Sequence, residues 1–260
     1  MRKVSIFMII LGMFIIIKTN IIKGEEIRYK NKIGIFAVGS YSINRYGDLQ
    51  EVTLDAVGRD GEPDYGIGGQ AGVKYYISSY FGVEAGYGYM YTQLRIKVED
   101  IFGNGTLGYY GQEVRAHYFP INIMFNIKVK ENTYLGLGGG ISIYEVNFFQ
   151  YSSNSDESIA TYVEGKGSSI GGNFKIRAES FIFGSNRFTI FSDILLRLAK
   201  ISELKDTTYN KTLKKIYVST SEYGDTRAAI GLSDLKNYEN FNVNLSGLQI
   251  TFGVTYYIGL

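Results

Sequence analysis

Residues 247–260 read GLQITFGVTYYIGL, and their two-residue alternation decides how the rest of the chain is interpreted. One set of alternate positions is apolar throughout: Leu248, Ile250, Phe252, Val254, Tyr256, Ile258 and Leu260. The positions between them are mostly Gly, Gln and Thr. Because successive side chains of a strand point to opposite faces, this segment predicts a strand with one apolar face. Such a strand fits a soluble β-sandwich or a transmembrane barrel with lipid outside and a lumen inside.

The other end of the chain favours export. Arg2 and Lys3 precede an apolar stretch of about 14 residues, 4–17, which is shorter than a membrane-spanning helix requires. We interpret residues 1–24 as a secretory signal peptide and residues 25–260 as the exported domain; an uncleaved N-terminal anchor is the alternative. The sequence has no cysteine, which excludes disulfides and thiolate chemistry.

The rhythm of the connections favours a membrane barrel over a sandwich. Eight amphipathic segments are expected at roughly 32–43, 66–77, 81 to beyond 91, 113–128, 133–149, 168–183, 187–203 and after 244. Long connections alternate with short turns at 78–80, 130–132 and 184–186. Outer-membrane barrels combine brief periplasmic turns with long outer loops. The sequence therefore predicts an all-β fold, an eight-stranded antiparallel transmembrane barrel. Residues 216–221 and 227–232 form a possible extra hairpin, which would extend outward or make ten strands.

Three irregularities interrupt the alternation. The apolar phase slips by one residue past Tyr91 and again past Glu145, as expected at a β-bulge or where the strand leaves the bilayer. Pro120 lies on the inward phase and cannot donate to a ladder, so it predicts another bulge. Several segments exceed the roughly 9–11 residues that cross a bilayer, so some hairpins are expected to project beyond it.

At three places the chain resembles the small outer-membrane β-barrel family, the porin-like group that includes eight-stranded barrels. Residues 117–125, HYFPINIMF, resemble its aromatic-Pro-aliphatic strand, and residues 134–140, YLGLGGG, resemble the Gly-rich strand that follows. Residues 253–260 resemble its C-terminal assembly signal. With the preceding Phe252, the residues that carry this signal are Phe252, Val254, Tyr256, Ile258 and Leu260. The family usually ends in Phe or Trp, and Leu260 departs from that pattern. The resemblance implies the outer membrane of a diderm bacterium, with membrane lipid and the barrel-assembly machinery as partners.

Charged residues on the inward phase are the candidate site. They are Lys74, Glu84, Lys175, Arg177, Glu179, Asp193 and Arg197, together with Lys32. An eight-stranded barrel is just wide enough to be filled by side chains, and buried charges must pair. The pattern predicts a lumen plugged by ion pairs; a narrow gated pathway that opens when pairs exchange is the alternative.

Other motifs give no enzymatic or metal site. His117 is the only histidine, so a conventional zinc site is not expected, and no motif matches it to a serine and an acid. Residues 66–71, GIGGQA, match a dinucleotide fingerprint, but the β alternation continues where that motif requires a helix. The net charge of +2 gives no reason to expect nucleic acid binding. We expect no cofactor and no catalytic residue.

Three functions fit these features. The first is a structural or surface-interaction protein, whose plugged barrel anchors loops that meet an extracellular ligand or host protein. The first loop, residues 44–65, is acidic, as expected of a solvated or cation-attracting rim. The second is a narrow pore or carrier for small molecules. The third is a lipid-modifying enzyme that would use His117.

Overall fold

The computed structural model describes residues 31–44, 65–78, 80–99, 107–153, 159–182, 186–206, 216–219, 228–230, 238–240 and 242–259. The predicted signal peptide, most of the acidic first loop and Leu260 lie outside these residues.

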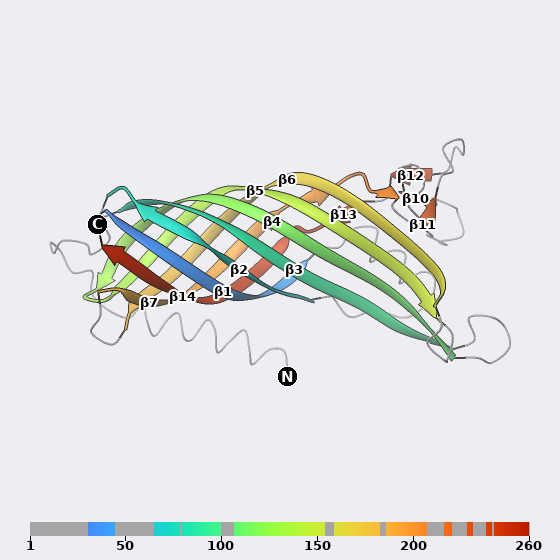
Figure 1. Cartoon of the computed structure of the whole chain (residues 1–260), viewed down its shortest axis with the longest axis horizontal. Coiled ribbons are helices and arrows are strands. Elements are labelled where there is room, and N and C mark those ends of the chain that lie inside the picture. Colours follow the sequence, from blue (N-terminus) through green and yellow to red (C-terminus); the bar gives the residue numbers. More distant parts are fainter. Residues whose placement is uncertain are drawn as a thin grey trace.

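Eight long strands form a closed antiparallel barrel (Figure 1). They are β1 (Lys32–Asn44), β2 (Tyr65–Tyr76), β3 (Phe81–Glu99), β4 (Leu107–Lys130), β5 (Thr133–Ser153), β6 (Ile159–Phe181), β7 (Phe188–Leu198) and β14 (Gly247–Gly259). Each strand pairs with its neighbours along the chain, and β14 pairs with both β7 and β1, which closes the ring. The predicted fold class is confirmed.

The short strands between β7 and β14 are not part of the closed ring. They are β8 (Lys200–Ile201), β9 (Lys205–Asp206), β10 (Ile216–Ser219), β11 (Ala228–Ile230), β12 (Tyr238–Asn240) and β13 (Val243–Asn244). Of these, β9 pairs with β6 at Gly165 and Lys166. Strands β10, β11 and β12 form a separate three-stranded sheet at the end opposite the short turns (Figure 1). In the described part of the chain, the extra hairpin therefore lies outside the barrel, and the ring keeps eight long strands.

The outside of the barrel carries an apolar belt. Many of the side chains in this belt are at least half exposed. The belt includes Ile35, Ile67, Val73, Ile121, Ile123, Ile141, Ile143, Ile170, Phe174, Ile190, Leu198, Phe252 and Val254. The alternate side chains of the same strands are buried in the lumen, as the period of two requires. An apolar surface of this extent surrounding a polar interior is the inverse of a soluble protein and identifies a face that meets lipid.

Aromatic side chains mark both borders of this belt. Towards the short turns, Tyr80 stacks on Phe125 at 6.3 Å and Phe188 meets Tyr256 at 5.2 Å between ring centroids. Towards the opposite end, Tyr41 stacks on Tyr65 at 5.5 Å. Aromatic rings concentrate at the membrane–water interfaces of such barrels, so these pairs delimit the membrane-spanning height.

Beyond the belt, the inside of the sheet becomes apolar and the outside polar. Val146 and Phe148 are buried, whereas Arg115 and Glu145 are exposed. The pairing of β3 with β4 and of β4 with β5 continues in one register through this region. The phase slips past Tyr91 and Glu145 are therefore exits from the bilayer and not bulges, because above the membrane the outer face meets water.

Pro120 leaves the register unchanged, so the prediction of a bulge there is wrong. Ala85 pairs with Ile121 and Gly88 pairs with Tyr118, and the two residue pairs between them are missing from the ladder. Pro120 has no N–H to donate towards β3, which accounts for the gap, and it still pairs on its other side with β5. The strand continues straight because its other ladder holds it.

Strands β3 to β6 are much longer than the membrane is thick. β4 has 24 residues, a length of roughly 80 Å at the usual rise per residue. A transmembrane barrel presents an apolar band of only about 25 Å. Figure 1 shows these four strands running past the ends of β1, β2, β7 and β14, so they form a projecting sheet outside the bilayer.

A lysine within the belt is expected to destabilise the barrel, and a lysine beyond it is not. Ile141 is 55% exposed in the belt, and Asn147 lies on the same face of β5 beyond the phase reversal. We expect Ile141→Lys to cost about 2–4 kcal/mol and Asn147→Lys less than about 1 kcal/mol. Urea unfolding in lipid vesicles, followed by heat-modifiable electrophoretic mobility, measures both. Equal losses would show that Ile141 does not face lipid.

Candidate functional site

Six charged side chains meet inside the barrel, and we call them the ion-pair cluster. They are Lys74 on β2, Glu84 on β3, Lys175, Arg177 and Glu179 on β6, and Asp193 on β7. None of these six residues is more than 4% exposed as a whole. Positions 175, 177 and 179 alternate along β6, so the strand period alone directs all three into the lumen.

Arg177 is the centre of this cluster. Its Nε and Nη2 donate to the two oxygens of Asp193 at 2.6 and 2.8 Å, and its Nη1 donates to Glu84. Lys175 Nζ lies 2.6 Å from Glu84 Oε2 and 3.9 Å from Asp193 Oδ2. A two-pronged arginine–carboxylate contact fixes both distance and orientation, so four side chains from three strands hold one arrangement.

A second pair extends the cluster towards the short turns. Lys74 Nζ donates to Glu179 Oε1 at 2.8 Å, and the same oxygen accepts from Thr189 Oγ1 at 2.5 Å and Tyr257 Oη at 2.9 Å. The Lys74 ammonium also lies 4.9 Å from the Phe191 ring centre. Three cations thus face three carboxylates, which offsets the cost of removing each from water.

Two other predicted inward cations lie apart from the cluster. Arg197 is 1% exposed but contacts neutral oxygens: Leu245 O at 2.8 Å, Gln249 Oε1 at 2.8 Å and Asn44 Oδ1. Lys32 Nζ donates to Asn186 O at 3.0 Å, and this bond is exposed at the mouth of the barrel. The alternation of side chains along a strand, which we call strand parity, determines whether a side chain points inward. It does not determine which residue that side chain contacts.

Aromatic rings close the end of the lumen near the short turns. Tyr76, Tyr134, Phe181 and Tyr257 form a buried group, which we call the aromatic floor. Phe181 lies 5.9 Å from Tyr134 and 5.8 Å from Tyr257 between ring centroids. Their strands end within a few residues of these positions, so the floor covers the lumen below the ion-pair cluster.

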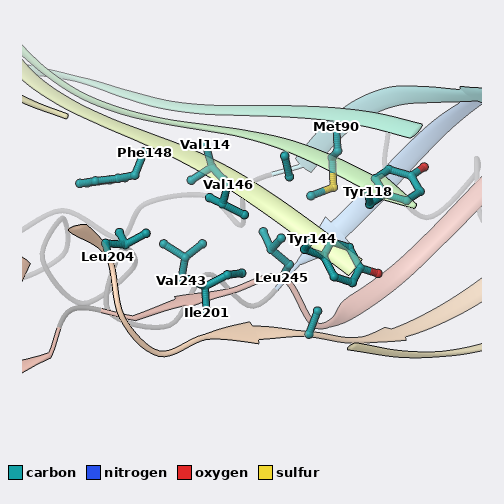
Figure 2. Packing of buried hydrophobic residues seen from close by; sticks show 12 residues of the cluster. Met90, Val114, Tyr118, Tyr144, Val146, Phe148, Ile201, Leu204, Val243 and Leu245 are labelled. Atoms are coloured by element: carbon teal, nitrogen blue, oxygen red, sulfur yellow. The ribbon is translucent and has the colours of Figure 1, made fainter. Parts of the chain in front are cut away.

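The opposite end is filled by a packed hydrophobic core, the apolar cap (Figure 2). Its members are Met90, Val114, Ala116, Tyr118, Tyr144, Val146, Phe148, Ala199, Ile201, Leu204, Val243 and Leu245. Figure 2 shows two opposing sides: one from β3, β4 and β5, the other from the chain around β8 and β13. The first and last parts of the β7–β14 connection, around β8 and β13, therefore pack against the inner face of the projecting sheet.

Hydrogen bonds from backbone N–H groups hold the side of the cap formed by the β7–β14 connection. Leu245 N donates to Ala199 O at 2.8 Å, and Ala199 N donates to Ser246 Oγ at 3.0 Å. Val243 pairs with Ile201 in the β8–β13 ladder. The sequence predicts a long connection between residue 203 and residue 244 and does not predict this cap. In the sequence, Val243 and Leu245 alternate with polar neighbours, and this alternation is the feature that could have predicted the cap.

His117 and residues 66–71 offer no catalytic arrangement in the described residues. His117 lies on the outer face, where its Nδ1 is 2.5 Å from Tyr87 Oη and its ring packs on Tyr89. Residues 66–71 lie within β2, so no helix follows their glycines. The described side chains include no group of three or more His, Cys, Asp or Glu suited to a metal ion. The described segments also contain no helix long and apolar enough to span a membrane.

Comparisons with known proteins return similar architectures only. No protein-family model and no curated protein sequence matches the chain. Among solved structures, the N-terminal β-barrel domain of Pseudomonas aeruginosa OprF is 10% identical, with a TM-score of 0.41, covering 88% of this chain and 98% of that chain. OprG from the same organism is 10% identical with a TM-score of 0.43, and the match covers 90% of this chain and 100% of that chain. A major outer membrane protein from Thermus thermophilus is 9% identical with a TM-score of 0.46, and the match covers 86% of this chain and 99% of that chain. The fold is that of the small outer-membrane β-barrels, and the strand pairing and apolar belt carry that conclusion.

Proposed function

We propose that this chain is a non-enzymatic outer-membrane β-barrel of a diderm bacterium, with a plugged lumen, that acts through its extracellular side. The observation that supports this is the filling of the lumen at three successive levels: the aromatic floor, the ion-pair cluster and the apolar cap. Each level is made of buried side chains from several strands. A solute would have to disrupt all three to pass, so the barrel serves as an anchor.

The projecting sheet and the small sheet of β10, β11 and β12 are the surfaces best placed to meet a partner. They extend well beyond the apolar belt, and binding residues favour loops held on a rigid scaffold. The exposed row Phe252, Val254, Tyr256 and Ile258 on β14 supports recognition by the barrel-assembly machinery.

Electrical recording in planar lipid bilayers tests the plugged lumen. We expect the purified full-length protein, refolded in detergent and shown to be closed by its heat-modifiable mobility, to insert without stable single-channel steps. The reason is that no continuous water-filled path is compatible with fully buried side chains at all three levels. A known porin refolded in the same detergent is the positive control. Regular, long-lived conductance steps from the wild-type chain would contradict the proposal.

A narrow carrier for small apolar molecules is the second candidate, and the gap in the β3–β4 ladder is the observation that favours it. The missing pairs beside Pro120 lie below the apolar cap, where a side passage between strands would open. Pro120→Val supplies the missing N–H donor. A carrier predicts that this variant takes up a small aromatic solute into vesicles more slowly than wild type, whereas an anchor predicts no protein-dependent uptake by either.

A further inference from the structure

Arg197 is a buried charge without a counter-charge in the described part of the barrel. Its side chain is 1% exposed, and its three hydrogen bonds go to a backbone carbonyl and two amide oxygens. Transfer of an ion from water to a protein interior costs several kcal/mol unless an opposite charge or strong hydrogen bonds offset it. The positive charge of Arg197 therefore requires a stabilising partner that the described carboxylates do not supply.

The neighbouring carboxylates are already engaged. Glu84 and Asp193 bind Arg177 and Lys175, and Glu179 binds Lys74. The three cations and three carboxylates of the ion-pair cluster therefore balance one another, and a negative partner for Arg197 must come from outside the cluster.

Unused hydrogen-bond donors lie beside this guanidinium. Arg197 has five N–H groups, of which three are used. The Tyr118 hydroxyl is buried, with its residue 2% exposed, and it approaches Gln249 without completing a hydrogen bond. Gln249 is oriented by its bond from Arg197 to Oε1, which leaves its amide N–H groups to donate elsewhere. The Tyr118 hydroxyl and two of the Arg197 N–H groups therefore have no acceptor among the described side chains.

We propose that Arg197, Tyr118 and Gln249 bind a small monovalent anion of the halide class. An excess positive charge with unused N–H and O–H donors is the chemistry that recognises an anion. The surroundings favour a small one: the Tyr118 ring stacks on Tyr144 at 5.9 Å between centroids, and it lies directly over Gly88, where a Cβ would come within 2.2 Å of it. The ion joins β4, β7 and β14 where the polar lumen meets the apolar cap.

Chloride-dependent stability tests this site without knowledge of the barrel's function. Full-length protein is refolded in detergent, and its unfolding rate in urea is compared in sodium chloride and in sodium isethionate of equal ionic strength. An ion that binds only the folded state slows unfolding, by about tenfold at roughly ten times its dissociation constant. Crystals grown in bromide should show an anomalous scattering peak between Arg197 and Tyr118.

Two matched tyrosine variants locate the effect. Tyr118→Phe removes a proposed donor, and we expect most of the chloride dependence to disappear. Tyr144→Phe removes a neighbouring hydroxyl that donates to Asn173 instead, and it should keep the wild-type dependence. Arg197→Met should abolish it; if that variant does not fold, the tyrosine pair still decides. Equal wild-type rates in both salts, or equal chloride dependence in the two tyrosine variants, would overturn the proposal.

Discussion

Arg177→Met is expected to destabilise the barrel by about 3–5 kcal/mol, one of the two largest losses that we predict for a single substitution. The substitution removes the partner of both Glu84 and Asp193 and keeps much of the side-chain volume. Two carboxylates then remain buried with Lys175 as their nearest cation. The free energy of unfolding in urea, measured in lipid vesicles by heat-modifiable mobility, gives the loss.

Arg115→Met is the matched control for this substitution. Arg115 also forms an ion pair, with Glu113 at 2.9 Å, but its side chain is 46% exposed beyond the membrane. Surface ion pairs contribute roughly 0–1 kcal/mol, so this variant should stay close to wild type. If both arginine variants lose the same small amount, the ion-pair cluster does not hold the lumen closed.

The barrel was predictable from sequence because one face of each strand meets lipid. Alternation along β14 and the three short turns indicate the strand number and the orientation of nearly every side chain. That information has a period of two and is local, so it survives without knowledge of tertiary contacts. The same parity predicts from the sequence alone that Lys74, Glu84 and Arg177 point inward, and all three are buried in the lumen.

Partners and strand ends were not predictable in the same way. Parity could not separate Arg197 from the ion-pair cluster, because the identity of its neighbours depends on the stagger between strands that are not adjacent in sequence. The sequence analysis begins the fourth and sixth segments at residues 113 and 168, whereas β4 begins at Leu107 and β6 at Ile159, so the outer ends of both strands were missed. Pro120 suggested a bulge because its effect on one ladder is visible in sequence, whereas support from the other ladder is not.

The three levels of lumen filling differ in chemistry for a physical reason. Within the bilayer, the apolar side chains of the barrel strands face lipid. The alternate side chains face the narrow lumen and include charges that must pair there. Beyond the bilayer, the wall faces water and the interior can again be apolar, as the cap around Phe148 and Ile201 is. One continuous sheet thus changes from a membrane barrel to a conventional hydrophobic core along its length.

Phe148→Ala and Phe149→Ala are expected to differ sharply although the residues are adjacent. Phe148 is fully buried in the apolar cap, and its truncation should cost about 3–5 kcal/mol. Phe149 lies on the outer face, where the Arg115 guanidinium is 4.7 Å from its ring centre; its loss should cost about 1 kcal/mol or less. Urea unfolding of both variants under the conditions used for Arg177 provides the comparison. A bulge past Glu145 would have turned Phe149 inward and reversed this order, so the two values test the exit of the strand from the membrane directly.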